Sequence, residues 1–62
     1  MLKRQIWLNY NGENHIYYKT SKNDLQALRQ AINTLERELG KVPGSLMGYF
    51  KTKPNSWGIN II

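Results

Sequence analysis

The chain has 62 residues, of which nine are Lys or Arg and four are Asp or Glu, so its net charge is +5. At this length a domain buries only about 60% of the surface of its unfolded chain, which makes stability marginal and homodimer formation an option. The absence of cysteine excludes disulfides and thiolate metal sites, and the single histidine, His15, cannot form a zinc site alone. We therefore expect one domain over residues 1–62, with no metal and no cofactor.

The beginning of the chain and its short apolar runs bear on where the protein acts. Residues 1–4 lead into alternating polar and apolar residues, not into the continuous apolar core of a secretion signal. A membrane-spanning helix needs about 20 predominantly apolar residues, far more than any run in this chain. We expect a cytoplasmic protein with no membrane partner, and the positive charge favours nucleic acid or an acidic protein as its partner.

Two strands joined by a hairpin are predicted over residues 3–10 (KRQIWLNY) and 14–20 (NHIYYKT). The first segment alternates between polar and apolar residues, and the second is rich in aromatic and β-branched residues. Asn11 and Gly12, which lie between them, both tolerate positive φ, and this pair is typical of a tight turn between antiparallel strands.

The register of this hairpin depends on the length of its loop, and a shift of one residue turns every side chain of one strand to the other face. A two-residue loop groups the following residues on one face: Ile6, Leu8, Tyr10, His15 and Tyr17. A three-residue loop with a bulge at Gly12 groups Ile6, Leu8, Ile16 and Tyr18 instead. We prefer the second register because it gives the more apolar core. Its opposite face consists of Lys3, Gln5, Trp7, His15, Tyr17 and Lys19.

The strongest helix signal covers residues 21–40. Large apolar residues recur at steps of three and four, as on one face of a helix: Leu25, Leu28, Ile32, Leu35 and Leu39. Ser21 followed by Asp24 predicts a helix start near Ser21, and Gly40 followed by Pro43 predicts its end at Leu39. The expected solvent face carries Gln26, Arg29, Gln30, Asn33, Glu36 and Arg37.

The last third of the chain allows two interpretations. Residues 46–53 (LMGYFKTK) are predicted as a strand, with residues 57–62 (WGINII) as a second strand that places Trp57, Ile59 and Ile61 on one face. Alternatively, Ser45 caps a short second helix at about 45–52, although Gly48 would weaken that helix by about 1 kcal/mol. The preferred interpretation gives the element order ββαββ.

These elements predict an α+β fold, a small two-layer domain in which an antiparallel sheet packs on one amphipathic helix. The second face of the sheet is left open to solvent or to a partner, so we expect a binding site there. The predicted core consists of Ile6, Leu8, Ile16, Tyr18, Leu25, Leu28, Ile32, Leu35, Leu39, Trp57, Ile59 and Ile61.

Few side chains are suited to catalysis. Glu13 is the only acidic residue near His15, and it occupies a solvent-facing position. Glu36 and Glu38 lie two residues apart on the predicted helix and so point to different sides. The chain also lacks a glycine-rich phosphate loop. We expect no enzymatic activity.

Aromatic and basic residues alternate along the predicted strands, a pattern typical of surfaces that stack on unpaired bases and neutralise phosphates. The function predicted is a non-enzymatic binding module for nucleic acid, either DNA or RNA. The alternative is a small protein that inhibits or regulates another protein through the same face, because strands and interfaces favour aromatic residues for other reasons too. The candidate binding residues are Lys3, Trp7, His15, Tyr17, Lys19, Tyr49, Lys51 and Lys53.

Overall fold

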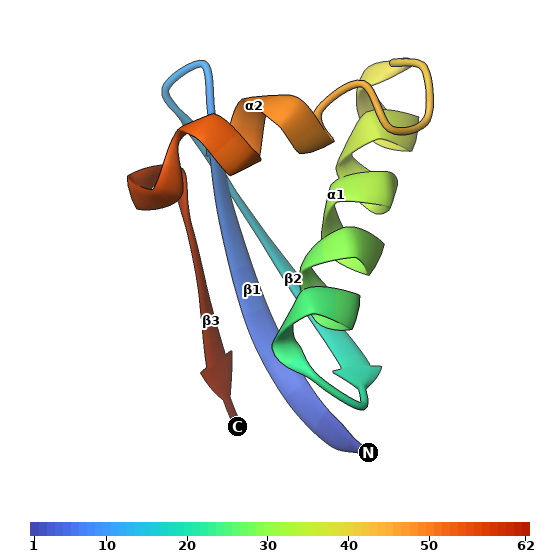
Figure 1. Cartoon of the computed structure of the whole chain (residues 1–62), viewed down its shortest axis with the longest axis vertical. Helices are drawn as coiled ribbons and strands as arrows, with labels where there is room; N and C mark the ends of the chain where they lie inside the picture. Colours follow the sequence, from blue (N-terminus) through green and yellow to red (C-terminus); the bar gives the residue numbers. More distant parts are fainter.

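A three-stranded antiparallel sheet lies behind two helices in a computed structural model that describes residues 1–62 (Figure 1). The elements are β1 (Leu2–Tyr10), β2 (Glu13–Ser21), α1 (Asp24–Leu39), α2 (Met47–Thr52), a short 3-10 helix (Pro54–Ser56) and β3 (Trp57–Ile61). The strand order is β2-β1-β3, so β1 is central. The α+β prediction is confirmed, but the element order is ββααβ and the predicted order ββαββ is wrong.

Helix α2 occupies the segment that we preferred as a strand, and the alternative of a short second helix is confirmed. Leu46 and Phe50 lie four residues apart, so a helical turn places both on the same face, where both are buried. Burying a ring such as that of Phe50 contributes about 1.5 to 3 kcal/mol, more than the helix loses at Gly48. No side chain caps this helix, so the expected capping role of Ser45 is not observed.

The hairpin has a two-residue loop, and the register that we preferred is wrong. Tyr10 pairs with Glu13, and the two loop residues both have positive φ, 53° at Asn11 and 79° at Gly12. A turn of this kind matches the twist of the flanking strands without a bulge. As a result Ile16 and Tyr18, which we expected in the core, are 52% and 55% exposed.

The N-cap of helix α1 lies two residues later than the predicted start at Ser21. The side chain of Asn23 accepts a hydrogen bond from the Gln26 amide at 2.8 Å and is the N-cap. Ser21 instead ends β2, where its hydroxyl donates to the Asn23 carbonyl at 3.0 Å. The predicted end of the helix is confirmed, because Gly40 adopts φ 70° and its amide donates a hydrogen bond to the Arg37 carbonyl.

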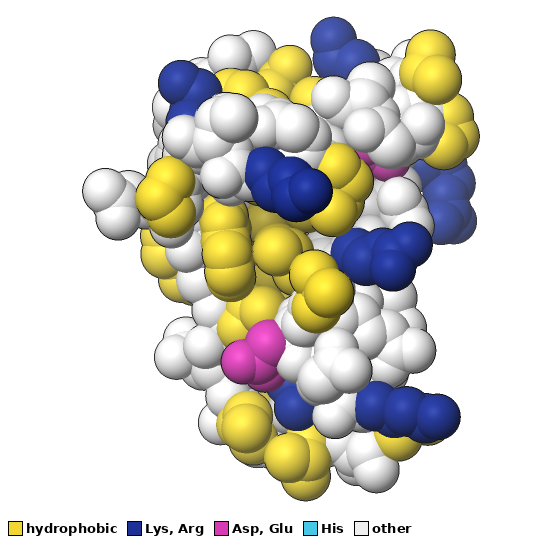
Figure 2. Space-filling model, viewed as in Figure 1, with side chains coloured by type: hydrophobic (Ala, Val, Ile, Leu, Met, Phe, Trp, Pro, Cys, Tyr) yellow, Lys and Arg dark blue, Asp and Glu magenta, His cyan; other side chains and the backbone are white.

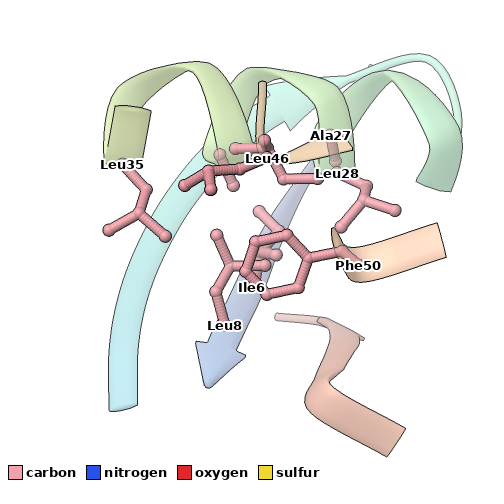
Figure 3. Packing of buried hydrophobic residues seen from close by; sticks show 9 residues of the cluster. Ile6, Leu8, Ala27, Leu28, Leu35, Leu46 and Phe50 are labelled. Atoms are coloured by element: carbon pink, nitrogen blue, oxygen red, sulfur yellow. The ribbon is translucent and has the colours of Figure 1, made fainter. Parts of the chain in front are cut away.

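The core lies between β1, α1 and α2, and Figure 3 shows the ring of Phe50 beside Ile6 and Leu8. Leu28, Ile32 and Leu35 are buried as predicted, whereas Leu25, Leu39 and Ile61 are exposed. The buried apolar residues are Ile6, Leu8, Ala27, Leu28, Ala31, Ile32, Leu35, Leu46 and Phe50.

Two buried charged side chains hold the elements together. Arg4 donates through Nε to Asp24 Oδ1 at 2.9 Å and through Nη1 to the Ser21 carbonyl at 2.6 Å, which ties β1 to the end of β2 and the start of α1. Glu36, which we expected on the solvent face, is buried instead. Its carboxylate accepts from the amides of Gly44 at 2.9 Å and Leu46 at 2.8 Å, and so anchors the loop between the helices.

Candidate nucleic-acid interface

Both helices pack on the side of the sheet that carries Ile6 and Leu8, and this leaves the other side, which we call the open face, without a covering layer. Side chains alternate along each strand, so the pairing of the strands defines which residues share this face. They are Lys3, Gln5, Trp7, Asn9, Asn14, Ile16, Tyr18, Thr20, Gly58 and Asn60.

Trp7 occupies the middle strand of the open face, between Ile16 on β2 and Gly58 on β3. Its indole lies so close to β3 that a Cβ atom at Gly58 would be 2.2 Å from Nε1. The glycine therefore provides the space that the ring occupies. The ring is partly buried by this contact and is held against the sheet.

The next row of the open face is joined by hydrogen bonds between side chains. Gln5 donates through Nε2 to the Tyr18 hydroxyl at 3.2 Å and accepts from Asn60 Nδ2 at 3.5 Å. Lys3 Nζ lies 6.0 Å from the centroid of the Tyr18 ring. The Tyr18 ring is thus positioned at its hydroxyl end, while the residue as a whole stays exposed.

The open face carries no acidic side chain. Asp24, Glu36 and Glu38 belong to α1 in the other layer, and Glu13 follows the parity of its partner Tyr10, which faces the helices. Lys3 lies on the face itself. Lys53 lies at its edge, where it lines with Trp7 a shallow hollow of about 480 Å³ formed against the end of α2 and the 3-10 helix. The electrostatic character of this surface is therefore neutral to positive.

The predicted site residues do not form one surface. Lys3 and Trp7 lie on the open face, and Lys53 lies at its edge. The predicted positions of the others are wrong, because the two-residue loop turns alternate residues of β2 to the helix side and because residues 47–52 are helical. His15, Tyr17 and Lys19 face the helix side of the sheet, while Tyr49 and Lys51 belong to α2.

Two of the displaced aromatic residues have structural contacts. Tyr49 packs edge-on against Tyr10 and Phe50, with ring centroids 4.9 and 5.0 Å away, and Lys53 Nζ lies 5.3 Å above its ring. Tyr17 packs on the core and donates its hydroxyl hydrogen bond to Glu38. Burial raises the pKa of Tyr17, and the hydrogen bond to the carboxylate raises it further.

The sequence reasoning missed two large residues of the open face, Ile16 and Tyr18. The three-residue loop that we preferred from the sequence places both in the core. The signal that identifies them is the Asn11-Gly12 pair, because a turn in which both residues take positive φ fixes Tyr10 opposite Glu13.

Comparison with protein-family models, with curated proteins and with solved structures finds no match to this chain. Its helices are all too short and too polar to cross a bilayer. No three His, Asp or Glu side chains gather as a metal site would require. The observations define a small two-layer α+β protein whose sheet presents an aromatic, acid-free surface.

Proposed function

We propose that this protein is a non-enzymatic, cytoplasmic binding module that holds single-stranded nucleic acid on the open face of its sheet. The observation that carries the proposal is the pair of rings, Trp7 and Tyr18, on a surface that has no acidic side chain. Aromatic rings on a sheet stack on bases of any sequence, each stack contributing about 1 to 3 kcal/mol.

The placement of the two rings suits consecutive bases. Trp7 and Tyr18 lie in neighbouring rows on adjacent strands, so their Cα atoms are diagonal neighbours about 7 to 8 Å apart. Each ring has fixed contacts in the free protein, Trp7 with Gly58 and Tyr18 with Gln5. Such pre-organised rings lose little conformational freedom when a base stacks on them.

The charges support the same partner. Lys3 lies near the Tyr18 ring, and Lys53 lines the hollow at the edge of the face together with Trp7. Both lysines can neutralise phosphates of a strand that crosses the face, Lys53 after its ammonium leaves the Tyr49 ring. The net charge of +5 adds a longer-range attraction for any polyanion. The amide groups of Gln5, Asn9 and Asn60 offer hydrogen bonds to base edges.

The test uses the Trp57→Phe variant, in which Trp7 is the only tryptophan. We expect single-stranded DNA or RNA oligonucleotides to quench its fluorescence at low salt, with recovery as salt is raised and counterions compete. Replacing Tyr18 by Ala should weaken binding by about 5- to 150-fold, the equivalent of one lost stack. An absence of quenching at low salt would contradict the proposal.

The charge contribution has a matched control. Lys3→Ala should weaken binding and reduce the salt slope by about 0.7, the value for one phosphate contact with a single strand. Arg29 is exposed on α1 in the other layer, so Arg29→Ala removes the same charge away from the open face. Equal losses in the two variants would show that the open face is not the binding surface.

A second candidate function is the binding and regulation of another protein through the same face. Ile16 favours it, because this apolar side chain is 52% exposed beside Trp7 and stacking on bases does not require it. An apolar protein interface should respond little to salt, unlike a phosphate-binding surface. A complex that survives nuclease treatment in a pull-down, and that Ile16→Asp abolishes, would favour this function.

A further inference from the structure

A second uncovered apolar surface lies on the helix side of the molecule. It is a groove of about 300 Å³ between α1 and β3, beneath α2, and Figure 2 shows hydrophobic side chains gathered in it. Its walls are mainly apolar and include Leu25 and Leu28 from α1, Met47 and Phe50 from α2, and Trp57 from β3. We call this surface the α1–β3 groove.

The groove follows from the dimensions of the elements. Three strands about 4.8 Å apart make a sheet wider than the 10 Å diameter of one helix. Helix α1 packs on β2 and β1, and α2 crosses only one end of the sheet, so the helix-side face of β3 is incompletely covered (Figure 1). Trp57 and Ile59 are only partly buried there, and Ile61 is exposed.

The rim of the groove carries a side chain suited to fill such a hollow. Leu25 is 61% exposed at the start of α1, on the lip of the groove. An exposed leucine next to an apolar hollow is the arrangement that a two-fold symmetric contact uses, because each copy offers the other both a projection and a recess.

The two ends of the groove carry opposite charges. Lys51 of α2 lines one end and makes no ion pair, while Asp24 lines the other end, where α1 begins. Asp24 is 70% exposed and uses Oδ1 for Arg4. If two grooves meet antiparallel about a two-fold axis, each Lys51 approaches the carboxylate of Asp24 from the other copy. The charged ends of one groove are therefore complementary to those of the same groove in a second copy.

We propose that the α1–β3 groove is the interface of a homodimer, in which Leu25 of each copy enters the groove of the other and Lys51 pairs with Asp24 across the axis. Burial in a dimer would add apolar contacts that a 62-residue chain lacks on its own. The open faces of both sheets stay outside this interface. The proposal therefore does not rest on nucleic-acid binding.

The first test is sedimentation equilibrium of the full chain at moderate salt, over micromolar to millimolar concentrations. We expect a reversible monomer–dimer equilibrium, and we expect Leu25→Asp to raise its dissociation constant about tenfold or more. Val42 is also exposed but lies outside the groove, so Val42→Asp is the matched control and should leave the equilibrium unchanged. Both variants should keep the circular dichroism of the parent, because neither residue is buried.

The second test examines the charged ends and the groove itself. Lys51→Glu would place two carboxylates together at each end, so dimerisation should weaken and partly recover as salt screens them. In the Trp7→Phe variant, Trp57 is the only tryptophan, and its emission should shift to shorter wavelength as the dimer forms. A chain that stays monomeric at all concentrations would overturn the proposal and leave the groove to another protein. A dimer that Leu25→Asp does not weaken would also overturn it.

Discussion

Trp7 and Gly58 form a cross-strand pair in which the Trp7 indole occupies the space that a side chain at position 58 would need. They are opposite each other on β1 and β3, and a Cβ at Gly58 would come within 2.8 Å of three atoms of the ring. A glycine weakens a strand because it has no side chain to pack, and the neighbouring ring compensates by covering it. Trp7 thus covers the glycine of the edge strand β3, and it does so on the open face of the sheet.

Replacing Gly58 by Ala should displace the Trp7 ring and lower the free energy of unfolding by about 1 to 3 kcal/mol, the usual cost of overpacking. Urea denaturation measures the loss, and the fluorescence of the Trp57→Phe background reports the ring. The control is Gly48→Ala, because no atom lies within 4 Å of a Cβ there and alanine favours the helix. If Gly58→Ala were as stable as Gly48→Ala, the indole would not occupy that space.

Local patterns in the sequence predicted the parts of the fold that depend on neighbouring residues. The apolar stripe of α1 identified Leu28, Ile32 and Leu35 as buried, and Gly40 identified the end of the helix. The alternation in residues 57–62 predicted a strand that the structure shows as β3 (Trp57–Ile61), including the shared face of Trp57 and Ile59. Each of these predictions rests on a periodicity or on a cap within one element.

Features set by contacts between distant segments were not predictable in the same way. Residues 47–52 are too short a run for periodicity to separate helix from strand, and the packing of Phe50 decides between them. Glu36 appeared to be a surface residue because its partners, the amides of Gly44 and Leu46, belong to a loop whose path the sequence does not show. The candidate site changed for a related reason, since one residue of register moved Tyr17 to the core side.

The buried carboxylate of Glu36 should be essential to the loop between α1 and α2. In Glu36→Gln the amide nitrogen cannot accept, so one of the two backbone N–H groups loses its partner, which costs about 1 to 3 kcal/mol. Urea denaturation should show this loss, and hydrogen exchange at the Leu46 amide should accelerate. Glu13→Gln is the control because Glu13 is exposed in the hairpin. A loss no greater than that of the control would mean that Glu36 does not anchor the loop.

The raised pKa of Tyr17 should make stability fall at high pH. The unfolded chain loses this proton at about pH 10, whereas burial and the Glu38 hydrogen bond keep it on the folded chain to higher pH. The stabilising contribution is complete below pH 10 and is lost progressively as the pH rises from there toward the folded pKa. Tyr17→Phe removes this titration, so urea melts above pH 10 should show a steeper decline for the parent chain.

A direct measurement of the same group is available in the tyrosinate absorbance. Subtracting the titration of Tyr17→Phe from that of the parent isolates Tyr17, and the difference curve should rise well above pH 10. In urea the difference curve should return to the ordinary range for tyrosine. A difference curve centred near pH 10 in the folded protein would show that Tyr17 is neither desolvated nor bonded to Glu38.

Two leucines of α1 separate folding from association. Leu35 is fully buried, so Leu35→Ala should lower the free energy of unfolding by about 2 to 5 kcal/mol and unfold much of a domain with so small a core. Leu25→Ala makes the same chemical change at an exposed position, and in dilute monomer it should alter stability by about 0.5 kcal/mol or less.

Thermal melts at several protein concentrations distinguish the effect on folding from the effect on association. A higher protein concentration should raise the melting midpoint of the parent chain, because only folded copies associate. The rise should be smaller for Leu25→Ala. Equal concentration dependence in both would show that Leu25 makes no contact between copies.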